Sequence, residues 1–112
     1  MKKIEAILQP FKLDDVRDAL KKVGLDGMTI FDVRGHGRQR GHKEIYRGQE
    51  YDVDLLPKVK IECVVSDDRV DETVGAIMEA ARTGSIGDGK IFISDMPQAL
   101  QIRSGLSLED AS

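Results

Sequence analysis

The chain has 112 residues, of which 40% are hydrophobic and 4% aromatic, and its formal net charge is −3. This length suits one domain with its own core and is too short for two. The acidic balance argues against a nucleic-acid binder, although 17 basic residues could form a local patch. No run approaches the ~20 apolar residues that span a bilayer, and no signal-peptide segment follows Met1. We therefore predict a cytoplasmic protein without membrane insertion.

An internal duplication organises the chain. The string Lys-Ile-Glu-Ala at residues 3–6 recurs as Lys-Ile-Glu-Cys at residues 60–63, and the helical pattern after each copy keeps this offset of 57. Alternating apolar residues predict strands at 4–8, 28–34, 55–65 and 89–93. Two βαβ units give an α+β, ferredoxin-like fold with a four-stranded antiparallel sheet. Helical spacing places two apolar stripes against the sheet, one of Leu13, Val16, Leu20 and Val23 and one of Val70, Val74, Ile77, Met78 and Ala81.

A long loop separates the second and third predicted strands. Residues 35–54 contain four glycines and show almost no apolar period, so they fit neither a helix nor a buried strand. Loops longer than about 12–15 residues are uncommon in compact domains and are usually functional elements or linkers. Because this loop joins two strands that a short turn could connect, we predict that it is functional.

A second glycine-rich stretch, residues 82–90, precedes the last predicted strand. That strand matches the first half only at an offset of 62, which predicts a second helix-to-strand connection five residues longer than the first. Glycine N–H groups, the hydroxyls of Thr83 and Ser85, and the charges of Arg82 and Lys90 would suit a phosphate cradle. The Gly-Asp-Gly string is equally typical of an ordinary turn into a strand.

The face of the sheet away from the helices would carry Ile7, Val64 and Phe92, and exposed apolar patches of this kind usually mark an interface. We predict a homo-oligomer, whose subunit number these residues do not fix. The single cysteine, Cys63, excludes an internal disulfide and is expected to be a small buried hydrophobe.

Long strings in this chain resemble the PII signal-transduction proteins of nitrogen regulation, and the resemblance extends over essentially the whole length. It implies a single PII-type domain over residues 1–112 and a homotrimer with ATP/ADP sites in clefts between subunits. It also implies that residues 37–55 form the family's T-loop, 82–90 its B-loop and 102–109 its C-loop. The matching strings are MKKIEAI at residues 1–7, PFKL at 10–13, GHGRQRGH at 35–42, YRGQEY at 46–51 and RTGSIGDGKIF at 82–92.

The resemblance also assigns the site residues. Gln39 is similar to the side chain that binds Mg²⁺ through the nucleotide, and Lys58 to the partner of a 2-oxoglutarate carboxylate. Gln39 and the backbone near Gly37 and Gly41 complete the 2-oxoglutarate site. Judged without the family, Lys58 would be a solvated strand residue and Gln39 an ordinary loop residue. Tyr51 matches the family's uridylylation target. The nucleotide contacts fall on Gly35, Gly37, Arg38, Val64, Gly87, Gly89, Lys90 and Arg103.

Three positions depart from the family's pattern. Ser85 stands where a basic residue is usual, and Gln101 where an arginine is common, so both changes remove positive charge from the predicted phosphate site. Gln49 replaces the usual alanine or serine, which excludes regulation by phosphorylation at that position.

The implied function is a non-catalytic nitrogen and energy signal transducer that binds ATP/ADP, Mg²⁺ and 2-oxoglutarate. Its expected targets are proteins such as an ammonium channel, a nucleotidyltransferase or a sensor kinase. The alternative is a divergent PII-like adenylate sensor that does not respond to 2-oxoglutarate. An acylphosphatase-like hydrolase would need an asparagine, which the chain lacks, and an RNA binder on this fold would expose more sheet aromatics than Phe92.

Overall fold

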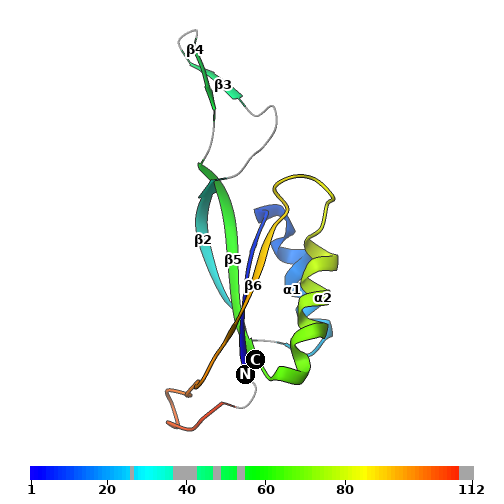
Figure 1. Ribbon diagram of the computed structural model, residues 1–112, viewed down its shortest axis with the longest axis vertical. Helices are drawn as coiled ribbons and strands as arrows, with labels where there is room; N and C mark the ends of the chain where they lie inside the picture. Colours follow the sequence, from blue (N-terminus) through cyan, green and yellow to red (C-terminus); the bar gives the residue numbers. More distant parts are fainter. Residues whose placement is uncertain (26, 37–42, 47–48, 53–54, 109–112) are drawn as a thin grey trace.

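A computed structural model describes residues 1–25, 27–36, 43–46, 49–52 and 55–108, and for the two segments between 43 and 52 it describes the backbone alone. The molecule is elongated, measuring 59 × 26 × 21 Å (Figure 1). In chain order its elements are β1 (Lys2–Leu8), the 3₁₀ turn η1 (Pro10–Lys12), α1 (Leu13–Lys22), β2 (Thr29–His36), β3 (Lys43–Tyr46), β4 (Gln49–Asp52), β5 (Leu55–Val65), the 3₁₀ turn η2 (Asp67–Arg69), α2 (Val70–Ala81) and β6 (Gly89–Asp95).

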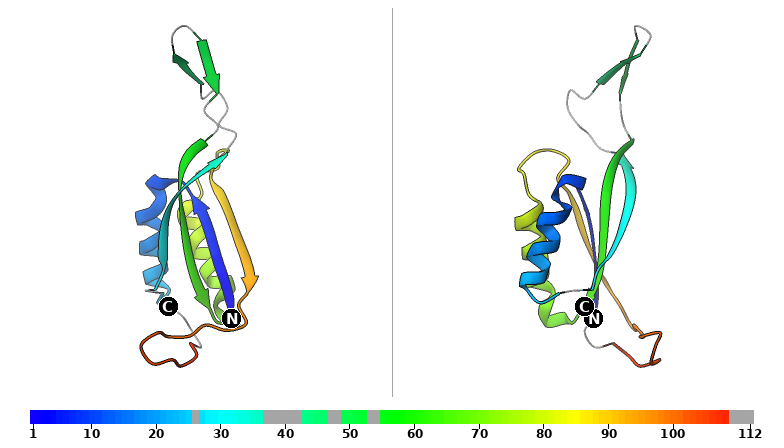
Figure 2. Two further views of the ribbon diagram at one scale, coloured as in Figure 1. Left: turned by 90° about the vertical axis from the view of Figure 1, so that its left-hand side faces the viewer. Right: turned by 180° about the vertical axis from the view of Figure 1, so that it is seen from behind.

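The main sheet has the strand order β2-β5-β1-β6, and every neighbouring pair is antiparallel. Both helices cover one face of this sheet and leave the other face open (Figure 2). This is the predicted ferredoxin-like arrangement. The two copies of the duplicated string lie against each other at its centre, where Ile4 pairs with Cys63 and Glu5 with Glu62.

The offset of 57 residues is confirmed in three dimensions, because η1 and η2 begin at Pro10 and Asp67 and the helices begin at Leu13 and Val70. The predicted five-residue difference between the two connections is not observed. The connections span residues 23–28 and 82–88, and α2 has 12 residues whereas α1 has 10. Part of the extra sequence therefore lengthens the helix, as expected for a run that ends in two alanines.

The core lies between the sheet and the helices. Both predicted helical stripes contribute to it, and Val16, Leu20 and Ile77 are almost completely buried. Cys63 is buried, as predicted. Met78, although it belongs to the second predicted stripe, is not buried, and 44% of its surface is exposed. The largest fully buried side chains are Ile4, Leu8, Leu20, Leu25, Ile61, Ile77, Val16, Val65 and Thr73.

The predicted bounds of β5, residues 55–65, are confirmed, whereas β2 begins one residue later and ends two residues later than predicted. Gly35 and His36 therefore belong to a strand, where they pair with Leu56 and Leu55. Within the predicted long loop, β3 and β4 form an antiparallel hairpin that lies beyond the end of the main sheet (Figure 1). The end of the sheet from which this loop leaves is called the loop end below, and the opposite end, which holds Met1, the terminal end.

The open face of the sheet is more polar at its centre than predicted. Lys60 lies 3.6 Å from Glu5 and 3.7 Å from Glu62, and its ammonium nitrogen is 4.5 Å from the centre of the Phe31 ring. Of the three apolar residues predicted for this face, Phe92 is half exposed while Ile7 and Val64 are partly buried. An oligomer interface here would therefore combine apolar contacts with ion pairs.

Candidate functional site

A cleft of about 490 Å³ lies on the open face at the loop end of the sheet. Gly35 and His36 at the end of β2 line one side, and Lys58 on β5 lies beside them. The other side is formed by residues 82–90, called the glycine loop from here on, which comprise the connection between α2 and β6 and the first two residues of β6. The residues that lead into the long loop and the glycine loop are far apart in sequence, but they line the same cleft. The lining residues are Ile7, Gly35, His36, Lys58, Ile86, Gly87, Gly89, Lys90 and Phe92.

Lys58 is the most informative residue of this cleft. Only 7% of its surface is exposed, so the interpretation of Lys58 as a solvated strand residue is wrong. Its ammonium donates to the Gly87 carbonyl at 2.9 Å, and no carboxylate pairs with it among the residues that the structure describes. Burying a cation is costly unless an anion compensates its charge. The cleft therefore favours an anionic ligand.

The glycine loop is held in shape by Asp88. Its carboxylate accepts hydrogen bonds from the backbone N–H groups of Thr83 and Gly84, each at 2.9 Å, and from the Thr83 hydroxyl. These bonds hold the pKa of Asp88 below its usual value. The N–H of Ser85 donates to the Thr83 hydroxyl oxygen at 3.1 Å. Three backbone N–H groups and one hydroxyl of the loop are thus used internally, and the part nearest the cleft is Ile86 to Lys90.

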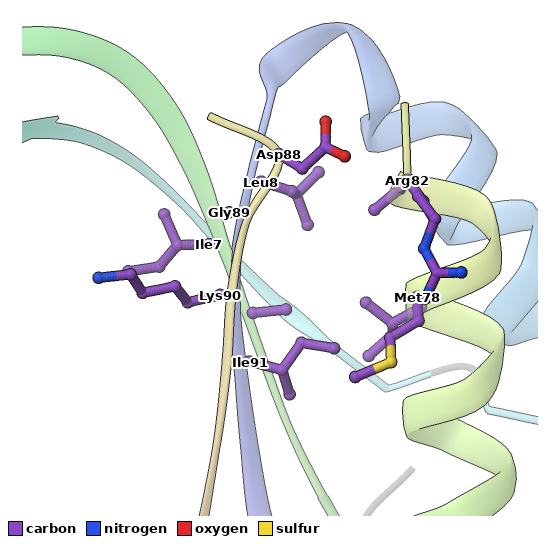
Figure 3. Close-up of a pocket in the computed structure, with 11 residues that line it drawn as sticks. Ile7, Leu8, Met78, Arg82, Asp88, Gly89, Lys90 and Ile91 are labelled. Atoms are coloured by element: carbon purple, nitrogen blue, oxygen red, sulfur yellow. The ribbon is translucent and has the colours of Figure 1, made fainter. Parts of the chain in front are cut away.

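Gly89 has a packing role in addition to any contact with a ligand. Its φ is +116°, and a Cβ atom at this position would lie 1.8 Å from the carbonyl oxygen of Ile7, so only glycine fits. The next residue, Lys90, points away from α2, as does Ile7 (Figure 3). The close approach of β6 to β1 at Gly89 thus places the Lys90 side chain on the open face, beside the cleft.

A smaller cavity of about 180 Å³ lies on the other face of the sheet, between α2 and the strands β1 and β6. Met78 and Arg82 line it from the helix, while Leu8 and Ile91 line it from the strands (Figure 3). Its lining is mainly apolar, and the residues of the predicted phosphate cradle that it includes are Gly89, Lys90 and Arg82. Arg82 lines this cavity and not the cleft, so the structure does not bring it to the predicted phosphate site. Because the Lys90 side chain points away from it, this cavity is separate from the cationic cleft.

Val64 and Arg103 do not lie with the other predicted nucleotide residues. Val64 pairs with Lys3 near the terminal end of the sheet, whereas Gly89 pairs with Leu8 at the loop end. Val64 lies six positions after Lys58 in β5, which is roughly 20 Å at the usual rise of a strand. Arg103 is exposed in the segment that follows β6 (Figure 1). Within one chain these two residues cannot complete the cleft.

The segment around Arg103 has its own hydrogen bonds. The N–H of Gly105 donates to the Gln101 carbonyl at 2.7 Å, and the Ser104 hydroxyl donates to the Gln101 side-chain oxygen at 2.9 Å. The N–H of Leu108 donates to the Ala99 carbonyl at 2.8 Å. The Gln101 side chain, at a position where the predicted site has lost a cation, is therefore used to close a turn.

Sequence comparisons place this arrangement in a known family. The model of the family described as "Nitrogen regulatory protein P-II" matches residues 1–106. The chain is 62% identical over 111 residues to the nitrogen regulatory protein P-II of Pasteurella multocida and 60% identical over 111 residues to that of Haemophilus influenzae, with 99% of each chain covered. It is also 62% identical over 105 residues to the nitrogen regulatory protein P-II 1 of Escherichia coli K12, with 94% of each chain covered.

The chain belongs to the P-II family. The resemblance inferred from the residue strings is therefore confirmed, and the protein is a signal-transduction regulator of the nitrogen regulatory class. Among the P-II site residues predicted above, the described cleft brings together Gly35, Lys58, Gly87, Gly89 and Lys90.

Several predicted P-II residues lie outside the described residues, namely Gly37, Arg38, Gln39 and Gly41, and the side chain of Tyr51 is likewise not described. The assignments of Mg²⁺ to Gln39 and of uridylylation to Tyr51 therefore stay predictions. In the described part of the chain, no cluster of His, Cys, Asp and Glu could hold a metal ion, and no helix is long and apolar enough to cross a membrane.

Sequence reasoning missed two residues of the cleft region. Asp88 was treated as part of a turn string, although an aspartate a few residues after a helix end commonly accepts from nearby backbone N–H groups. Gln9, just after β1, donates its side-chain amide to the Gly87 carbonyl at 2.8 Å. No local sequence signal indicates this contact, because 78 residues separate its partners.

Proposed function

We propose that this P-II family protein is a non-catalytic cytoplasmic transducer of nitrogen and energy status that binds ATP or ADP, Mg²⁺ and 2-oxoglutarate. The buried Lys58 ammonium is the main support, because it faces a cleft of about 490 Å³ without a carboxylate partner among the described residues. A ligand carboxylate would supply the missing anion. Gly87, Gly89 and Lys90 lie beside it and suit the phosphates of a nucleotide.

The proposed assembly is a homotrimer with its ligand sites between subunits. A nucleotide can contact both Lys90 and Val64 only if one subunit supplies the cleft and a neighbour supplies Val64 and Arg103, because these residues lie at opposite ends of the sheet in one chain. Sedimentation would test this assembly. A monomer at micromolar concentration, with or without ATP, would contradict it.

The long loop would carry the signal. One root of the loop, Gly35–His36, lines the cleft, and the other root, the start of β5, lies three residues before Lys58, which also lines it. A ligand in the cleft would therefore lie close to where residues 37–55 leave the domain. Ordering each backbone residue costs about 1–2 kcal/mol, so differential contacts of Mg-ATP with 2-oxoglutarate and of ADP at these roots can bias the loop between states. Partners such as an ammonium channel, a nucleotidyltransferase or a sensor kinase would recognise those states.

Tyr51 is the proposed uridylylation site on that loop. A nucleotidyl group there would add bulk and negative charge to the element that meets partners and would block docking. Incubation with the cognate transferase should label the wild type and leave Tyr51→Phe unlabelled. Equal labelling of both would move the modification site elsewhere.

Titration calorimetry separates the proposal from its alternative, an adenylate sensor that does not respond to 2-oxoglutarate. ATP with Mg²⁺ should bind, and 2-oxoglutarate should bind to the Mg-ATP complex. Nucleotide binding without any 2-oxoglutarate binding would establish the alternative. Failure to bind ATP at all would overturn both.

A further inference from the structure

One backbone oxygen connects the two sides of the cleft. The Gly87 carbonyl accepts a hydrogen bond from the Lys58 ammonium at 2.9 Å and another from the Gln9 side-chain amide at 2.8 Å. A carbonyl oxygen has two lone pairs, so both are used. Because the carbonyl belongs to the glycine loop and both donors belong to strand ends of the sheet, this oxygen anchors the loop to the sheet.

A carboxylate ligand would weaken one of the two hydrogen bonds that the Gly87 carbonyl accepts. The full negative charge of a carboxylate attracts the Lys58 ammonium more strongly than the partial charge of a carbonyl oxygen does, so the ammonium turns toward the ligand and its bond to the Gly87 carbonyl weakens. Gly87 has a φ of +97°, in a region where glycine moves with little steric hindrance. The loop therefore needs a second anchor at the moment when Lys58 engages the ligand.

We propose that Gln9 is this anchor, a positioning residue that holds the glycine loop by its Gly87 carbonyl while Lys58 binds the carboxylate of a small oxo acid. The inference rests on the proposed function, because it takes Lys58 as the group that meets 2-oxoglutarate. Gln9 acts through Gly87 and needs no contact with either ligand. Its role is to keep the phosphate-binding side of the cleft in place while the carboxylate-binding side is occupied.

The test uses Gln9→Met, which keeps the length of the side chain and removes its donor. Without 2-oxoglutarate, Lys58 still holds the Gly87 carbonyl, so the affinity for Mg-ATP should change less than about twofold. At saturating Mg-ATP, the affinity for 2-oxoglutarate should fall about three- to tenfold, the effect of one lost hydrogen bond. A general loosening of the loop would instead lower the affinities for Mg-ATP and 2-oxoglutarate equally. Gln98→Met, the same change at an exposed glutamine, is the matched control and should alter neither affinity.

A second variant, Gln9→Glu, keeps the shape of the side chain and places a carboxylate beside Lys58. It should reduce 2-oxoglutarate binding more than Gln9→Met does, because the introduced carboxylate competes for the ammonium and repels the ligand. If the wild type binds Mg-ATP but no 2-oxoglutarate, the proposed function fails. Suppose instead that the wild type binds both ligands. If both Gln9 variants then bind as the wild type does, or lose affinity for both ligands equally, the proposed function stands and the role of Gln9 is overturned.

Discussion

The two helix-to-strand connections of this molecule occupy equivalent places in the duplicated fold and are built differently. The first, residues 23–28, closes α1 with Gly24 at a φ of +83°, and the N–H groups of Gly24 and Leu25 donate to the Lys21 and Leu20 carbonyls, each at 2.9 Å. This is the Schellman pattern of a helix end, made by backbone groups, and the Arg69 guanidinium adds a hydrogen bond to the Val23 carbonyl. The second, the glycine loop, uses the Asp88 side chain to bind the N–H groups at its start.

This difference indicates how one scaffold can give a structural end and an end that offers a candidate ligand site. The first connection lies at the terminal end of the sheet, where Met28 packs against the core. The second lies at the loop end, where a carboxylate that satisfies the first N–H groups leaves the later residues free to line a cleft with Lys58. The following predictions test this contrast.

The largest expected effect is on Gly89 of the glycine loop, compared with Gly24 of the first connection. Gly89→Ala should destabilise the protein by about 3–5 kcal/mol, because it combines a left-handed φ with a Cβ atom 1.8 Å from the Ile7 carbonyl oxygen. Gly24→Ala should cost only about 1–2 kcal/mol, because its φ is similar but the nearest atom, on Arg69, lies at 3.6 Å. Urea unfolding measures both. Equal losses would mean that the strands relax apart at Gly89, and the proposed packing role would be withdrawn.

Lys58 tests the ligand-binding end directly. Lys58→Met should weaken 2-oxoglutarate binding by roughly 10- to 100-fold, since a charge-assisted hydrogen bond is lost. The same change should leave the free energy of unfolding equal or higher, because it replaces a buried ammonium that lacks a carboxylate partner among the described residues.

Lys60→Met is the matched control for that experiment. Lys60 lies two residues along β5 on the same face, and Glu5 and Glu62 already pair with it. Its replacement should leave 2-oxoglutarate affinity unchanged. If Lys58→Met binds 2-oxoglutarate as the wild type does, or if both variants lose it equally, Lys58 is not the carboxylate partner.

Much of this fold could be predicted from local pattern. The bounds of β5, the two apolar helix stripes and the offset of 57 between the helices followed from alternation, helical spacing and the repeated string, since these signals depend on near neighbours in sequence. The lengths of the two connections were less accurate, because helix propensity at Ala80 and Ala81 extends α2 beyond the repeat.

The candidate site was predictable in its residue types and not in its geometry. The alternation in β5 places Lys58 on the open face, which suggested a solvated side chain, and its burial depends on the glycine loop, 29 residues away, folding over it. The separation of Val64 from Lys90 likewise follows from strand direction and sheet order. Such long-range placement leaves no trace in a single sequence.

A third prediction addresses the missing cation at Gln101. If a neighbouring subunit brings this segment to the phosphates, Gln101→Arg should tighten ATP binding about tenfold, and less at high salt, where screening reduces the gain. Titration calorimetry at two salt concentrations measures it. Ser104→Ala is the control, because Gln101→Arg also removes the bond from the Ser104 hydroxyl. Unchanged or weaker ATP binding would show that position 101 does not face the phosphates.

The last prediction concerns Cys63, which pairs with Ile4 in the half of the sheet nearer the terminal end. Burial raises the pKa of its thiol to about 11, from an ordinary value of 9.0. The thiol therefore stays protonated in the folded protein at a pH where the unfolded chain has already ionised. The resulting stability is complete below about pH 9 and is lost progressively as the pH rises toward 11. Urea unfolding across this range should show a steeper decline for the wild type than for Cys63→Ala. Two results together would contradict this prediction: an equal decline of the unfolding free energy in both proteins, and rapid reaction of the native thiol with a disulfide reagent at pH 8. They would mean that solvent reaches Cys63 and that this part of the sheet is looser than its packing indicates.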